Sequence, residues 1–130
     1  MKTLAALLVP LLLAGCHSWT VPATLRGEAF YLQRIALPPE AVLSVTLADV
    51  SLADAPAQPL AHYTGPSGAQ VPLPFELSYD PGQVVPGHRY VLSARIEAAG
   101  ALLWINTEAV PVALDGTDPQ PLRVRLDPAR

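Results

Sequence analysis

Prolines interrupt this chain so often that it has little room for long helices. Fifteen prolines occur among its 130 residues. A proline inside a helix removes a backbone hydrogen bond and clashes with the preceding turn. Between the prolines, apolar and polar residues alternate in short runs, which is the period of a half-buried β-strand. The pattern argues against helical bundles and predicts an all-β domain.

The clearest run covers residues 71–79. Alternate positions in it are apolar and share one face of the expected strand: Val71, Leu73, Phe75, Leu77 and Tyr79. Pro72 and Pro74 lie on the other face. Because proline cannot donate a hydrogen bond to a ladder, we predict that this strand is at the edge of a sheet, or is bulged, over its first half. Its unpaired side, or an apolar face of a sheet, is our candidate for binding a strand or helix of a partner.

Six further runs complete the expected fold, at residues 28–35, 43–48, 60–64, 90–97, 102–105 and 122–126. The run at 102–105 is continuously apolar, which is typical of a central strand covered on both sides or of a strand under a loop. In the last run, Arg123 and Arg125 are expected to face solvent. Short strands with regular turn signals predict one antiparallel β-sandwich of about seven strands and immunoglobulin-like size, over residues 27–128.

The N-terminus has the organisation of a secretory signal peptide. Residues 1–15 contain Lys2, then an apolar run of about eleven residues, then small residues. That run is too short to cross a bilayer, which needs roughly 20 residues as a helix. We therefore expect the leader to be cleaved.

The single cysteine follows this leader directly. The string Leu13, Ala14, Gly15 and Cys16 resembles the lipobox of bacterial lipoproteins. The resemblance implies acylation of Cys16, which becomes the first residue of the mature chain and binds membrane lipid. No cofactor other than this covalent lipid is expected. Residues 16–26 are interpreted as a lipidated tether.

Two residues of the tether bear on its position at the membrane. Trp19 is compatible either with the lipid headgroups or with a plain linker. His17 follows the cysteine, where enteric bacteria use aspartate to retain a lipoprotein at the inner membrane. By this resemblance the expected location is the inner leaflet of the outer membrane, facing the periplasm.

The charge of the mature chain excludes one class of partner. Without the leader it has seven arginines, eleven acidic residues and no lysine. A mildly acidic domain lacks the basic surface that nucleic acid requires. We expect no nucleic-acid binding.

Motifs that could support catalysis or metal binding are weak in this chain. The string Gly65-Pro66-Ser67-Gly68 lacks the spacing of a nucleophile elbow and is interpreted as a polar loop. The histidines at 17, 62 and 88 have no ligand-like spacing to a second ligand, and two aspartates, Asp115 and Asp118, are too few for a calcium loop. We predict a turn at 115–118, no metal site and no enzymatic activity.

Several ordered strings resemble one protein family. They are Arg34 to Pro39, Leu47 to Ser51 with Asp54 to Pro56, Val71 to Leu77 with Tyr79 to Pro81, His88 to Tyr90, and Ala94 to Ile96. They are similar to the YbaY-like lipoproteins, grouped with YscW, the lipoprotein chaperone (pilotin) of type III secretion. The resemblance implies a periplasm-facing β-sandwich that binds a secretin or another envelope protein.

Two functions are therefore open at this point. The first is a non-enzymatic assembly module of the pilotin type. The second is a module that binds a small ligand, a glycan or an incoming hydrolase through loops at residues 64–70 and 80–88.

Overall fold

The computed structural model describes residues 10, 15 and 21–129. Within them the chain forms nine strands and one short 3-10 helix, η1 (Pro81–Gln83). The strands are β1 (Ala23–Phe30), β2 (Val42–Asp49), β3 (Gln58–Pro66), β4 (Leu73–Tyr79), β5 (Tyr90–Ala98), β6 (Ala101–Ile105), β7 (Val110–Val112), β8 (Leu122–Arg125) and β9 (Asp127–Pro128). No helix in this part of the chain is long and apolar enough to cross a bilayer.

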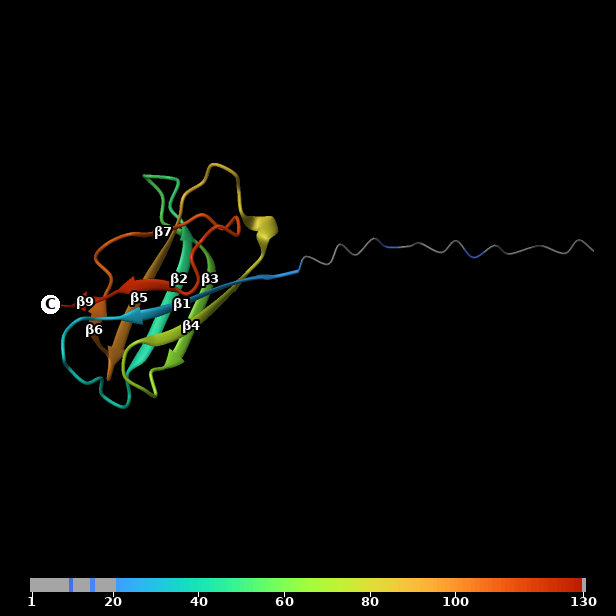
Figure 1. The fold of residues 1–130 in the computed structure, drawn as a ribbon. Coiled ribbons are helices and arrows are strands. Elements are labelled where there is room, and N and C mark those ends of the chain that lie inside the picture. The colour runs from blue at the N-terminus through green and yellow to red at the C-terminus, as the bar shows by residue number, and fades with distance from the viewer. Residues whose placement is uncertain (1–9, 11–14, 16–20, 130) are drawn as a thin grey trace, which may run out of the picture.

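The strands form two packed sheets, which confirms the predicted β-sandwich. One sheet has the order β4-β1-β8, and the other has the order β3-β2-β5-β6-β9, with β7 also paired to β5. In Figure 1, β1 crosses the steep strands β2 and β5 of the larger sheet. The prediction of about seven strands missed β7 and β9, which are too short to display an alternating pattern.

One pairing differs from the expected antiparallel arrangement. β8 lies parallel to β1, with Gly27 opposite Leu122. After β8 the chain passes from the smaller sheet to the larger one, where β9 pairs with β6. A parallel pair needs a long connection between its two strands. Nothing in the local pattern of residues 122–126 indicates in which direction this strand runs relative to β1.

The core lies between the two sheets. Alternate residues of β2, β4 and β5 point into it, and they include Leu43, Leu47, Leu77, Leu92 and Ile96, all nearly inaccessible to solvent. Their burial removes apolar surface from water, which is the main driving force for the fold.

The first strand begins earlier than predicted. β1 starts at Ala23, so residues 23–26 belong to the sheet and the expected tether ending at residue 26 is shortened. The predicted strand at 28–35 is wrong beyond Phe30. The inward positions of β1 include Gly27 and Ala29. Because these residues are small, the sequence of β1 does not show a clear alternation of large apolar and polar side chains.

The loop after β1 is held against the larger sheet by aromatic packing. The ring of Tyr31 stacks on that of Trp104, with centroids 3.8 Å apart and planes 4° from parallel. The Tyr31 hydroxyl also donates a hydrogen bond to the backbone oxygen of Ile35. These contacts are made by residues 31–35, which the sequence analysis had expected to continue the first strand.

The apolar run at 102–105 is not a strand covered on both sides. Leu102 in β6 is 42% exposed, while Trp104 is buried. A bulge opposite Ile96 and Glu97 changes which face each β6 residue presents. The Asn106 side chain then accepts a hydrogen bond from Ala94 N–H and donates to Leu92 C=O, which supports β5 between β6 and β7.

Candidate functional site

β4 is an edge strand, as its prolines predicted. It ends the order of the smaller sheet and is paired with β1. Leu73, Phe75, Leu77 and Tyr79 are buried in the core, and Val71 precedes the strand. These apolar side chains are therefore not a contact surface, and β4 offers a partner its backbone edge and its outward side chains.

The outer face of the smaller sheet carries paired charges. Arg26 and Glu76 lie 3.3 Å apart, and Arg123 and Glu28 lie 3.9 Å apart. The Arg123 guanidinium also lies 4.4 Å from the centre of the Phe30 ring. Exposed ion pairs of this kind contribute little stability. Their effect is to leave this face without a strong charge of either sign.

β3 is another edge strand, besides β4, β8 and β9, and the sequence analysis did not identify it as one. It ends the order of the larger sheet and is paired with β2. On its outer face, His62 Nδ1 lies 2.9 Å from the Thr46 hydroxyl, and His62 Nε2 lies 2.6 Å from the Thr64 hydroxyl. Pro59 and Pro66, near its two ends, were the available signal.

A shallow groove lies beside β3 on the outer face of the larger sheet. It has a volume of about 370 Å³. Small side chains on β2 and β5 form its floor, and His62 and Arg95 contribute to its lining; the floor side chains are Ser44, Thr46, Ala48 and Ser93. Hydroxyl groups and apolar atoms are both available there to a bound chain.

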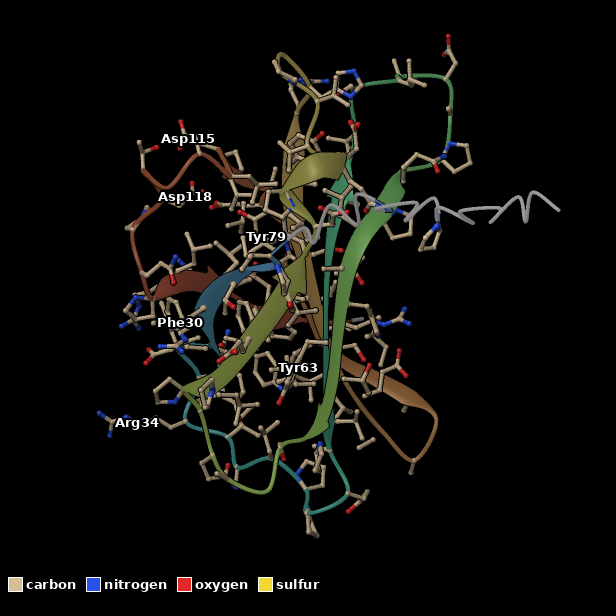
Figure 2. The ribbon with its side chains drawn as sticks, turned by 90° about the vertical axis from the view of Figure 1, so that its right-hand side faces the viewer. Phe30, Arg34, Tyr63, Tyr79, Asp115 and Asp118 are labelled. Carbon is tan, nitrogen blue, oxygen red and sulfur yellow. The ribbon has the colours of Figure 1, made fainter. Side chains whose placement is uncertain are left out.

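A second hollow lies at the seam where β3 approaches β4. Its volume is about 360 Å³, and its lining includes Tyr63 of β3, Pro74 and Phe75 of β4, and Gly27 of β1. Figure 2 shows Tyr63 between the ribbons of β3 and β4. The rings of Tyr63 and Phe75 are 6.5 Å apart and tilted by 46°. The two edge strands thus share one apolar contact region.

The two loops considered for ligand binding lie at opposite ends of β4. Residues 64–70 end before this strand, and residues 80–88 begin after it. Seven residues of strand span roughly 23 Å. The loops also have structural roles, since the Gln70 side chain accepts from Leu37 N–H at 2.7 Å and Val85 N–H donates to the Tyr90 hydroxyl at 2.8 Å. They do not form one combined site.

An Asp–His pair joins Asp49, the last residue of β2, where the next loop begins, to the loop before β5. His88 Nδ1 lies 2.5 Å from Asp49 Oδ2, and Ser51 N–H donates to Asp49 Oδ1 at 2.9 Å. Arg89 N–H donates to the Ser51 hydroxyl at 2.7 Å. Hydrogen bonds from Ser51, and then from His88, lower the pKa of Asp49 from 3.8 to about 2. The sequence analysis did not indicate Asp49 as a partner of His88.

We expect the replacement Asp49→Asn to change the response of stability to acid. The pKa of Asp49 is lower in the folded protein, so its stabilising effect is present above pH 3.8 and lost as the pH falls toward about 2. Thermal unfolding followed by circular dichroism should therefore show a flatter dependence of Tm on pH for the variant in this window. Asp54→Asn, at an exposed position of the same loop, is the control. Parallel curves for wild type and Asp49→Asn would contradict the prediction.

The segment around Asp115 and Asp118 is a turn, as predicted. Asp115 Oδ1 accepts from Thr117 N–H at 3.0 Å, and Asp118 accepts from the N–H groups of Ala113 and Leu114. Figure 2 shows both aspartates on the loop near Tyr79. Burial, and then the charges of Asp118 and Asp115, raise the pKa of Tyr79. Residues 21–129 contain no cluster of three or more acidic, histidine or cysteine side chains suited to a metal ion.

Most of the lipobox lies outside the described residues. This applies to Leu13, Ala14 and Cys16, whereas Gly15 is described and exposed. The lipidation of Cys16 therefore stays a prediction from the sequence. The string 65–68 includes the end of β3, and Ser67 N–H there donates to Ala41 C=O at 2.8 Å.

The chain is a small β-sandwich with open sheet edges and shallow surface hollows. Residues 21–126 match the model of the family described as the type III secretion system lipoprotein chaperone, YscW. The chain belongs to this family, which confirms the resemblance seen in the sequence.

Two relatives support this assignment. The Escherichia coli K12 lipoprotein YbaY is 44% identical over 91 residues, which are 69% of this chain and 48% of YbaY. The chain thus spans about half the length of this curated relative. The structure of an alternative pilotin from the type II secretion system of Vibrio cholerae aligns with a TM-score of 0.78 and 40% sequence identity. That alignment covers 85% of this chain and 99% of the pilotin.

Proposed function

We propose that this protein is a lipid-anchored, non-enzymatic chaperone of the pilotin type. It binds a secretin subunit and assists its assembly in the outer membrane. The observation that carries the proposal is the match to the Vibrio cholerae pilotin, because it covers 99% of that chain at 40% identity. A likeness of this extent includes nearly every element on which that pilotin could depend.

The proposed anchor is lipid on Cys16. The order of cationic residue, apolar run, small residues and cysteine supports it. Several acyl chains suffice for stable attachment, whereas one chain alone binds marginally. Since His17 is not aspartate, we propose the inner leaflet of the outer membrane, with the domain facing the periplasm.

The alternative function, ligand or hydrolase binding through the two loops, has less support. The loops lie at the two ends of β4 and are occupied by hydrogen bonds within the domain. The exposed edges of β3 and β4 are features that suit a polypeptide partner better than a small molecule.

The proposed function is tested by the fate of the secretin. In a strain lacking this protein, we expect the secretin subunit to be reduced in the outer-membrane fraction and to accumulate in the inner-membrane fraction. Tagged, acylated protein should also recover the secretin from detergent-solubilised membranes. An unchanged secretin distribution, together with no recovery of secretin, would contradict the proposal.

A further inference from the structure

The outward side of β3 carries backbone groups that no other strand of residues 21–129 pairs with. Pro66 lies opposite Val42, and Pro59 lies opposite Ala48 in the β2–β3 register. A proline has no N–H, so both positions must be non-hydrogen-bonded pairs of the antiparallel ladder. His62 and Thr64 then have the same orientation as Pro66, because such pairs alternate along the strand, and the bulge at Leu60 keeps Pro59 in step with them. Their N–H and C=O groups point away from β2.

The register of the neighbouring strands supports this orientation. Val45 lies opposite both Tyr63 and Ala94. The N–H and C=O of Ala94 are hydrogen-bonded to Asn106, on the side of β5 away from β2. Val45 therefore directs its own backbone groups toward β3, and pairs there with Tyr63. The residues on either side of Tyr63, His62 and Thr64, accordingly direct theirs outward.

Both faces of this edge have space for side chains. The groove of about 370 Å³ lies next to His62 on the outer face. The hollow of about 360 Å³ lies next to Tyr63 at the seam with β4. In an added strand, successive side chains point to opposite faces. One extended segment along β3 could therefore place side chains in both spaces.

We infer that the free edge of β3 binds an extended segment of the partner polypeptide, which adds a strand to the larger sheet. The inference rests on the proposed function, since the segment belongs to the secretin subunit. Backbone hydrogen bonds to His62 and Thr64 supply affinity, and the two hollows select side chains. The prolines at 59 and 66 limit the usable edge to a short stretch, which suits a linear segment better than a second folded domain.

The test compares matched proline substitutions on the two edges. Thr64→Pro removes an outward N–H of β3, and Ser78→Pro removes an outward N–H of β4, since Ser78 has the same parity as Pro74 in its ladder. A proline whose missing N–H faces solvent is tolerated at a sheet edge. Circular dichroism establishes that each variant is folded. The probe is a set of overlapping synthetic peptides of about 15 residues that tile the secretin of the same organism.

We expect one or a few peptides to bind the wild-type domain and Ser78→Pro, and to bind Thr64→Pro at least about tenfold more weakly, or 1.4 kcal/mol. In the wild-type protein, amide exchange followed by NMR should slow at His62 and Thr64 when that peptide binds. This second measurement does not depend on any variant.

Several results would overturn the inference. Among them are equal binding by Thr64→Pro, weakened binding by Ser78→Pro alone, protection of other amides without His62 and Thr64, and protection of these two in a dimer without peptide. If the full-length secretin is captured but no peptide binds, the linear-segment mode is wrong while the proposed function stands. If neither the peptides nor the full-length secretin binds, the proposed function itself fails.

Discussion

Cys16→Ser is expected to release the protein from the membrane into the soluble periplasmic fraction. Serine has no thiol for acylation, so the variant loses its covalent lipid. Each buried methylene of an acyl chain contributes about 0.8 kcal/mol to membrane binding, and losing several chains removes the attachment. Fractionation of cells followed by immunoblotting measures the result.

The matched control for this experiment is Ser18→Ala, two positions after the cysteine. It leaves the thiol in place and should remain in the membrane fraction. A Cys16→Ser protein that also stays with the membrane after a high-salt wash would contradict lipid anchoring. The domain itself should unfold at the same temperature in both variants, because β1 begins only at Ala23.

The length of the tether adds a geometric expectation. Since β1 begins at Ala23, six residues separate Cys16 from the first strand. Fully extended, the path from Cys16 to Ala23 spans about 25 Å. The start of β1 is therefore held within that distance of the lipid surface if Cys16 is acylated.

Gly27→Ala is expected to destabilise the folded domain by about 3 kcal/mol, near the upper end of typical overpacking costs. A Cβ atom at this position would lie 2.4 Å from Cζ of Phe75 and 2.8 Å from the backbone oxygen of Leu122. The ring is buried and the oxygen belongs to β8, so neither can withdraw cheaply. Chemical denaturation of the two proteins measures the difference in the free energy of unfolding.

A control and a partial rescue sharpen this prediction. At Gly82 an added Cβ would be 3.1 Å from the flexible side chain of Asp80, so Gly82→Ala should cost much less. Combining Gly27→Ala with Phe75→Leu removes the ring contact but leaves the Leu122 contact. The double variant should therefore lose less stability than the sum of the single ones. Additive losses would show that the Phe75 contact is not the cause.

The strands with strong alternation were predicted well, and those with small inward residues were not. Residues 73–79 were identified because their inward positions are all large and apolar. The first strand was predicted at residues 28–35 and lies at Ala23–Phe30. The error arose because Gly27 and Ala29, which are small, occupy inward positions and give no hydrophobic signal. β6 was predicted to be covered on both sides or to lie under a loop because its residues are continuously apolar. A bulge, which the sequence does not display, turns Leu102 outward and leaves it exposed.

The sheet edges and the Asp–His pair also differ in how far the sequence predicted them. Pro74 indicated the β4 edge correctly, since a missing donor is a local property. Pro59 and Pro66 carried a similar signal for β3, but residues 60–64 between them alternate weakly. The pairing of Asp49 with His88 joins loops that are far apart in the chain. No spacing rule connects such residues.

The sequence by itself determined the secondary-structure class, the edge at β4 and the family, and it predicts a leader with a lipobox. Each of these depends on residues close together in the chain: a period of two, a proline without a donor, or an ordered string. The tertiary structure decided that β8 runs parallel to β1, that β3 ends the larger sheet, and that the edges of β3 and β4 meet at the seam of Tyr63 and Phe75. These features required the structure because pairing joins residues far apart in the chain, and a strand's own pattern does not specify its neighbours.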